Sequence, residues 1–145
     1  MRRIQRDVCH EELIKSLTFA DGAIFKEIWR VLLFAAALGV KEGRRRPIGK
    51  SDSGKAMPET YFSSPGWRGF LYLIGIADSG DSACLKGTED AQDGLVTAFE
   101  EYANQGLYIL TEHMISSSSP LDELTSLLLE TLKPEAATPV IDDLI

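Results

Sequence analysis

The sequence predicts an all-α fold, a single-domain bundle of about five helices with one long basic loop between the second and the third. Three observations lead to this class. Apolar residues recur every three or four positions over long stretches, few segments alternate apolar and polar residues as strands do, and helix-start signals precede the apolar stretches. The 145 residues, 44% of them hydrophobic, suffice for one domain with a real core. We expect a helical domain over 1–133, with its long loop at 41–64, and an acidic, apolar tail over 134–145.

The first two predicted helices lie in the amino-terminal third. A short one runs from Val8 to Leu17, with Asp7 as its cap. The second opens at Asp21-Gly22, and Gly39 is its expected stop. Its apolar residues cover most of its circumference, which predicts a central helix contacted on several sides. They are Ile24, Phe25, Ile28, Trp29, Leu32, Phe34, Ala35 and Leu38.

Three more helices follow the long loop. The third begins with Ser64 as cap and Pro65 at its first position, and its small polar face predicts a central place. The fourth begins at Thr88 and carries a stripe from Ala91 to Met114, which favours one continuous helix over a break near Gly106. After four serines, Ser119-Pro-Leu-Asp122 starts the last helix. Its expected stripe is Leu121, Leu124, Leu128 and Leu132.

The charge is unevenly divided along the chain. The formal net charge is −7, which by itself argues against a nucleic-acid partner. Residues 1–72, however, hold 13 Lys and Arg against 8 Asp and Glu, whereas residues 73–145 hold 2 against 14. The sequence therefore predicts two surfaces of opposite charge, and so two partners.

No motif in the sequence predicts an enzyme. Gly49 to Lys55 matches the phosphate-loop pattern G-x-x-x-x-G-K, but Ala56 takes the place of the magnesium-binding hydroxyl and no strand precedes the motif. A flexible polar loop is the better interpretation. The carboxylate pairs, such as Glu100-Glu101, are expected to form a solvated acidic face.

Metal, cofactor and membrane sites are not predicted either. Cys9 and His10 are adjacent, so on a helix they point about 100° apart and rarely bind one ion. We expect Cys9 and Cys84 to be small buried hydrophobes in a cytoplasmic protein. The longest apolar run, Val31 to Val40, is too short to span a bilayer and predicts a buried helix.

The strongest candidate for function is the basic loop, in which six cations fall within 15 residues. Arg forms bidentate bonds with phosphate, and a mobile loop can follow a nucleic-acid backbone. Arg2, Arg3 and Arg6 would extend the patch. A solvated, idle loop and a loop that docks on an acidic protein surface are the alternatives. The predicted nucleic-acid-binding residues are Lys41, Arg44, Arg45, Arg46, Lys50 and Lys55.

Two groups of residues carry a family resemblance. The first runs from Ile24-Phe25 through Phe34-Ala-Ala-Ala-Leu-Gly39 to Gly43-Arg-Arg45 and Pro47, and the second is Glu100-Glu-Tyr-Ala-Asn-Gln-Gly-Leu107. Over roughly 24–110 the chain resembles the Dnd-system-associated protein four group, small proteins associated with bacterial DNA phosphorothioation. Dnd systems replace a non-bridging oxygen of the DNA backbone with sulfur, and associated restriction proteins attack DNA that lacks the mark. The resemblance implies an accessory role without a catalytic residue set.

Together these observations predict a non-enzymatic accessory protein of a phosphorothioation-linked restriction system, without a cofactor. Its basic loop would bind DNA or a DNA-bound partner, and its acidic carboxyl half would bind another protein, such as a restriction or modification protein of the system. The alternative is a purely protein-binding or self-associating helical adaptor that does not touch DNA.

Overall fold

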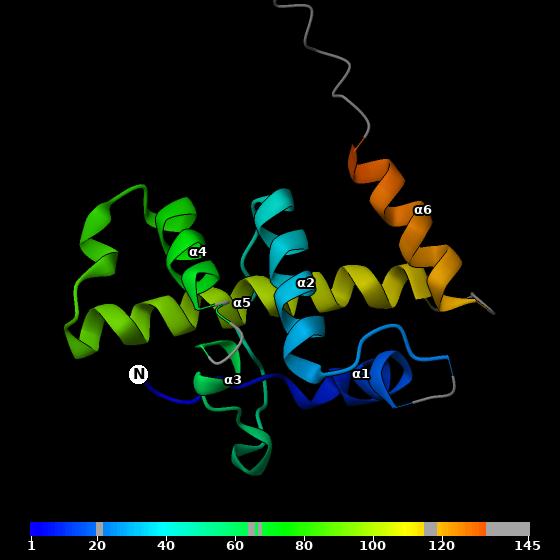
Figure 1. Ribbon diagram of the computed structural model, residues 1–145, viewed down its shortest axis with the longest axis horizontal. Coiled ribbons are helices and arrows are strands. Elements are labelled where there is room, and N and C mark those ends of the chain that lie inside the picture. Colours follow the sequence, from blue (N-terminus) through cyan, green and yellow to red (C-terminus); the bar gives the residue numbers. More distant parts are fainter. Residues whose placement is uncertain (20–21, 64–65, 67, 115–118, 133–145) are drawn as a thin grey trace, which may run out of the picture. The chain divides into compact units, whose positions relative to one another are not determined.

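The structure, a computed structural model, describes residues 1–19, 22–63, 66, 68–114 and 119–132. Within these residues it is helical, with isolated bridges and no β-sheet, so the all-α prediction is confirmed. The chain divides into two compact units, Met1–Glu112 and His113–Ile145. The helices, labelled in Figure 1, are α1 (Glu11–Thr18), α2 (Ile28–Glu42), α3 (Thr60–Ser63), α4 (Gly69–Ser79), α5 (Glu89–Met114) and α6 (Pro120–Leu132).

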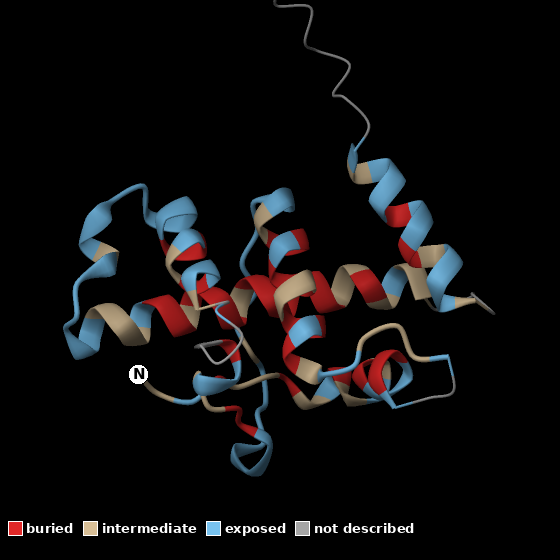
Figure 2. Ribbon diagram, in the orientation of Figure 1, coloured by how far each residue is buried: buried red, intermediate tan, exposed pale blue. Residues whose placement is uncertain are grey.

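Helix α5 forms the axis of the first unit. Its residues from Leu95 to Leu110 are mostly buried, including the polar Glu100, Asn104 and Gln105. Figure 2 shows this buried stretch where α2 and α4 meet α5. Phe62 of α3 packs edge-on against Phe99 of α5, with ring centroids 5.3 Å apart. The predicted continuous stripe of this helix is therefore confirmed.

Helices α2 and α5 cross at close range because glycines meet the opposite backbone. A Cβ atom added to Gly106 would collide with the carbonyl group of Ala35, and one added to Gly39 would collide with that of Tyr102. Both contacts are with backbone atoms, which cannot rotate away as a flexible side chain can. The two glycines therefore set how closely the helices approach.

The predicted limits of the second helix are wrong at both ends. It begins at Ile28 after an extended Glu27, and not at Asp21-Gly22. It also continues through Gly39 and ends at Gly43, whose φ of 72° is the left-handed conformation that glycine adopts without strain. Gly39 lies against the backbone of Tyr102, so this glycine serves the packing of two helices and does not end α2.

Helix α4 does not hold the central place predicted for it. It buries Leu71, Ile74 and Gly75, but Leu73 is 60% exposed, and Phe70 and Ile76 are exposed to 38% and 40%. The expected start signals at 64–65 lie outside the described residues. The helix ends at Ser79, where Gly80 takes the left-handed conformation.

Helices α5 and α6 begin where the capping signals place them. The hydroxyl of Thr88 accepts a hydrogen bond from the backbone of Ala91, and Pro120 is the first residue of α6. Of the leucines of α6, Leu124 and Leu127 are buried, whereas Leu121, Leu128, Leu129 and Leu132 are exposed. The predicted tail at 134–145 lies outside the described residues. Among the helices that are described, none has the length and apolar character that crossing a membrane requires.

Candidate nucleic-acid interface

Residues 43–59, the part of the predicted long loop between α2 and α3, form a strap held against the amino-terminal segment. Its backbone pairs with the amino-terminal segment at two bridges, Ile4 with Met57 and Asp7 with Ser51. The first is closed by two hydrogen bonds of 2.8 and 2.9 Å between Ile4 and Met57. The loop that was expected to be flexible thus has regular backbone contacts with the amino-terminal segment. Short helical turns at Ser53–Lys55 and Thr60–Ser63 also interrupt it.

Asp7 fixes the strap near its middle. One carboxylate oxygen accepts a hydrogen bond of 3.0 Å from the backbone of Cys9, as the predicted cap. The other accepts hydrogen bonds from the backbone N–H groups of Gly49 and Lys50, at 2.8 and 3.4 Å. Burial would raise the pKa of Asp7, but these backbone donors outweigh it and the pKa is lowered. The ionised carboxylate thus stabilises the folded strap.

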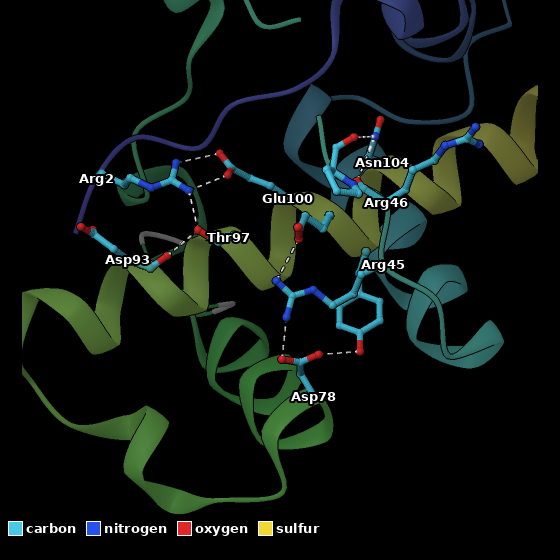
Figure 3. A network of polar contacts seen from close by, with 11 residues as sticks. Arg2, Arg45, Arg46, Asp78, Asp93, Thr97, Glu100 and Asn104 are labelled. Carbon is cyan, nitrogen blue, oxygen red and sulfur yellow. Dashed lines mark hydrogen bonds and ion pairs between the residues drawn. The ribbon is translucent and has the colours of Figure 1, made fainter. Parts of the chain in front are cut away.

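Asn104 of α5 holds the strap nearer its start. Its amide nitrogen donates to the carbonyl oxygens of Arg46 and Pro47, at 3.0 and 3.1 Å, as seen in Figure 3. Its amide oxygen therefore faces Nε2 of the buried His10, 2.7 Å away. A neutral histidine must carry its proton on Nε2 to make that contact. The strap, α5 and the amino-terminal helical turn meet at this one side chain.

Arg45 joins the strap to two helices. Its guanidinium donates to Asp78 of α4 at 2.7 Å and to Glu101 of α5 at 2.9 Å, and it lies over the ring of Tyr102 (Figure 3). Tyr102 completes the cluster by donating to Asp78 at 2.9 Å. Burial opposes the charge of Arg45, but the two carboxylates keep its pKa raised. Arg45 is thus engaged within the protein.

The predicted solvated acidic face is wrong for Glu100 and Glu101. Glu100 is only 6% exposed, and Arg2 binds it with two guanidinium nitrogens at 2.6 and 2.9 Å. Arg2 also donates to Thr97, one turn earlier on α5 (Figure 3). Two of the three amino-terminal arginines that were expected to extend the basic patch are therefore engaged, because Arg6 binds Glu11 at 2.8 Å.

The remaining predicted cations differ in how exposed their side chains are and in whether those side chains have partners. Arg46 lies over the ring of Tyr108, with its guanidinium carbon 3.7 Å from the ring centroid. Lys55 lies 3.4 Å from Glu11, and Arg44 is 70% exposed and 3.8 Å from Glu42. Lys41 and Lys50 are exposed, and no partner for their side chains occurs within the described part of the chain. Five of the six cations therefore lie along the strap and Lys41 lies in the last turn of α2, and together they do not form one uniform patch.

A cleft brings part of this set together with aromatic side chains. It measures about 410 Å³ and lies between the amino-terminal segment, the strap turn at Ser53–Lys55 and α3. Three cations line it, Arg3, Arg6 and Lys55. Its aromatic lining is Phe19, Trp29 and Tyr61, and its one lining carboxylate, Glu27, accepts a hydrogen bond from Trp29. We name this site the basic–aromatic cleft.

Three cleft residues have the freedom that ligand binding needs. Phe19 is 71% exposed and Tyr61 is 53% exposed, so both rings are accessible. The guanidinium of Arg3 is exposed, with no partner within the described residues. Neither aromatic residue was among the predicted site residues, because only cations were counted. Tyr61 lies just beyond the last predicted cation, and this interleaving of aromatic and basic residues was the available signal.

The other sites considered from the sequence, a phosphate loop and a metal site, do not form in the described residues. The Gly49–Lys55 motif forms an Asp52-capped helical turn, not a strand followed by a helix. Both cysteines are free, and Cys9 is exposed, so the prediction that it is buried is wrong; Cys84 is half-buried. Although the residue is exposed, partial burial of its thiol raises the pKa of Cys9, which keeps the thiol protonated. No cluster of three potential metal ligands was found in the part of the chain that the structure describes.

Comparison with known proteins identifies a family. A family model described as DNA sulphur modification system-associated protein 4 matches residues 3–143. The match covers nearly the whole chain, including the strap, the cleft and both groups of residues that carry the resemblance. No curated relative and no solved structure matches the chain.

Proposed function

Because the chain belongs to the family of DNA sulphur modification system-associated protein 4, we propose that it is an accessory protein that contacts DNA for such a system. The observation that carries the proposal is the basic–aromatic cleft. It combines cations, which bind phosphate, with accessible rings, on which unpaired bases stack. The exposed cations Lys41, at the end of α2, and Arg44 and Lys50, on the strap, would extend the contact along the backbone.

The charges at the cleft favour an anionic ligand that has more than one phosphate. Glu11 already binds Arg6 and Lys55, and both bonds help to lower its pKa against the effect of burial. Arg3 is the cation free to bind a phosphate at once. Lys55, which is 44% exposed, reaches a second phosphate by leaving Glu11. Each phosphate that these cations neutralise releases counterions, so the affinity should fall as salt rises.

The aromatic residues favour DNA with unpaired nucleotides over an intact duplex. Bases in a duplex are stacked on one another and do not present their faces to a protein, whereas single strands do. Tyr61 and Phe19 are exposed rings at the cleft. We therefore expect single-stranded DNA, or duplex DNA with an unpaired end, to bind more tightly than a closed duplex.

We propose that the protein binds without catalysing a reaction of its own. The histidine in the best-defined polar cluster, His10, is buried and serves to hold Asn104. The raised pKa of Cys9 makes its thiol a poor nucleophile at neutral pH. The polar groups around the strap are thus used for structure.

The test is a salt titration of DNA binding, measured by fluorescence anisotropy with a single-stranded oligonucleotide and a closed duplex. Replacing Arg3 and Lys55 by Gln should weaken binding and lower the salt slope by about 0.7 for each single-strand phosphate that the variant no longer neutralises. Replacing Tyr61 by Leu should cost about 1–3 kcal/mol in single-strand binding and should leave the salt slope unchanged. Lys86→Gln, which removes one exposed cation outside the cleft, is the control for charge and is compared with each single change, Arg3→Gln and Lys55→Gln.

Parent-like affinity and salt slope in the Arg3/Lys55 double variant would contradict the proposal. So would a loss of binding in the Lys86 control as large as in the double variant, because net charge alone would then explain the affinity.

A further inference from the structure

The first unit has an apolar groove that the proposed DNA contact does not use. It measures about 290 Å³ and lies between α2 and α4. Leu33, Ala37 and Val40 form the α2 wall, and Phe70, Leu73, Ile74 and Ala77 form the α4 wall. In Figure 1 these two helices rise from α5 beside each other. The groove explains why α4 exposes leucine and phenylalanine side chains to solvent.

Cations border the α2 wall of the groove. Arg30 precedes Leu33 by three residues, so helical spacing places it beyond one end of that wall. Arg44 follows directly after the helix, which ends at Glu42 and Gly43, and its guanidinium lies 3.8 Å from the Glu42 carboxylate. Lys41 follows Ala37 by four residues and is exposed. On the α4 side the nearest acid, Asp78, is already bound by Arg45 and Tyr102. An apolar ligand with negative charge therefore suits the groove.

Helix α6 has that character. It carries Asp122, Glu123 and Glu130 and no cation. Leu128 and Leu129 are exposed, as are Leu121 near its start and Leu132 at its end, the last at 77%. Leu121 and Leu128 are seven residues apart, as are Leu33 and Val40 of the α2 wall, so each pair spans two helical turns, about 10 Å.

We propose that the α2–α4 groove binds helix α6 of a second copy of the chain. The exposed leucines of α6 enter the groove between Leu33 and Leu73, and its carboxylates lie near Arg30, Lys41 and Arg44. The same chain carries both partners of this contact, an apolar groove with cations beside its α2 wall and an acidic helix with exposed leucines. The contact would bury both apolar faces at once.

The charge complementarity also fixes the expected response to salt. The rim pairs are exposed and screened, so added salt should weaken association. The leucines contribute most of the affinity through burial, and this part persists at high salt. Self-association should therefore fall with salt without being abolished, whereas DNA binding at the basic–aromatic cleft should fall steeply.

The experiment is sedimentation velocity of the full chain over a range of concentrations, without DNA. The wild type should associate, and Leu73→Asp should weaken association about tenfold or more because it places an acid in the groove. Ile76→Asp is the matched control, since Ile76 is exposed on the same helix but does not line the groove. Leu128→Asp, which alters α6 instead, should weaken association as Leu73→Asp does.

Mixing the two disabled variants gives the decisive result. The Leu73→Asp chain retains an intact α6 and the Leu128→Asp chain retains an intact groove, so the mixture should form heterodimers that neither variant forms alone. Circular dichroism checks that each variant is folded. A wild type that stays monomeric at all concentrations, a mixture that does not associate, or an Ile76→Asp control as weak as Leu73→Asp would each overturn the proposal. None of these results depends on DNA binding.

Discussion

At the scale of single residues, neighbouring arginines of the strap have opposite environments. Arg45 binds two carboxylates and a ring on two helices, whereas Arg44 is 70% exposed with one distant partner. Identical residues in one basic run are therefore not equivalent. Substituting the whole run would mix a loss of stability with any loss of DNA binding.

The first prediction separates these two effects. Arg45→Ala should lower the free energy of unfolding by about 1–3 kcal/mol, because Asp78 and Glu101 lose a charged hydrogen-bond donor. Arg44→Ala should change it by less than about 0.5 kcal/mol. Urea denaturation followed by circular dichroism measures both. Equal values for the two variants would show that the Arg45 cluster does not contribute to stability.

The second prediction concerns His10. Its burial lowers its pKa below the ordinary value of 6.5, and its contact with Asn104 opposes this effect only in part. The unfolded chain then binds more protons than the folded chain as the pH falls through 6.5, so the free energy of unfolding falls on acidification. The slope contributed by this group cannot exceed about 1.4 kcal/mol per pH unit.

His10→Gln removes the titration while keeping a donor for Asn104. Its free energy of unfolding should depend less on pH between about 5 and 7 than that of the parent. His113→Gln, a change of the other histidine, is the control. A His10→Gln variant with the parental pH dependence would show that another group is responsible.

At the scale of whole elements, the crossing of α2 and α5 leaves no space for a side chain at Gly39 or Gly106. Gly106→Ala should destabilise the protein by about 3 kcal/mol or more, because the added methyl group meets the backbone of Ala35. Gly94→Ala, on the same helix with nothing within 4 Å, should instead stabilise it by about 0.5–1 kcal/mol. Thermal unfolding of both variants and of the parent measures the two changes in stability. Destabilisation of similar size at both positions would exclude the steric explanation.

Capping residues and apolar periodicity predicted the starts of helices and the buried face of α5 correctly where each residue serves a single structural purpose. Thr88 and Pro120 mark the starts of α5 and α6, and the stripe of α5 is buried as its period indicates. Gly39 was misinterpreted because a glycine at a helix crossing and a glycine at a helix end are identical in sequence. Only the partner helix, about sixty residues later, distinguishes them.

Contacts between distant segments account for the other differences. The cations of the strap could be counted from the sequence, but their partners Asp78, Glu101 and Tyr108 lie far along the chain. Whether a cation is engaged or free therefore depends on tertiary pairing. The cleft likewise needs Arg3, Phe19 and Tyr61 from three segments that are separate in the sequence.

At the scale of the whole molecule, the net charge of −7 and a basic cleft act in opposite directions on DNA. The Debye length is about 30 Å at 0.01 M ionic strength and about 8 Å at 0.15 M. Acidic residues anywhere on a protein of this size therefore repel DNA at low salt, and only local charges matter at higher salt. The acids of α6 should accordingly oppose DNA binding while they support self-association at the groove.

One triple variant tests both effects. Replacing Asp122, Glu123 and Glu130 by Asn, Gln and Gln changes the net charge from −7 to −4. DNA affinity should rise a few-fold at low salt and return to the parental value at 0.15 M or so, as screening removes the long-range repulsion. Self-association should weaken, because the groove rim loses its partners. Thr125→Ser with Thr131→Ser, two neutral changes on the same helix, should alter neither measurement. If both measurements moved in the same direction, a change in the fold of α6 would be responsible rather than its charge.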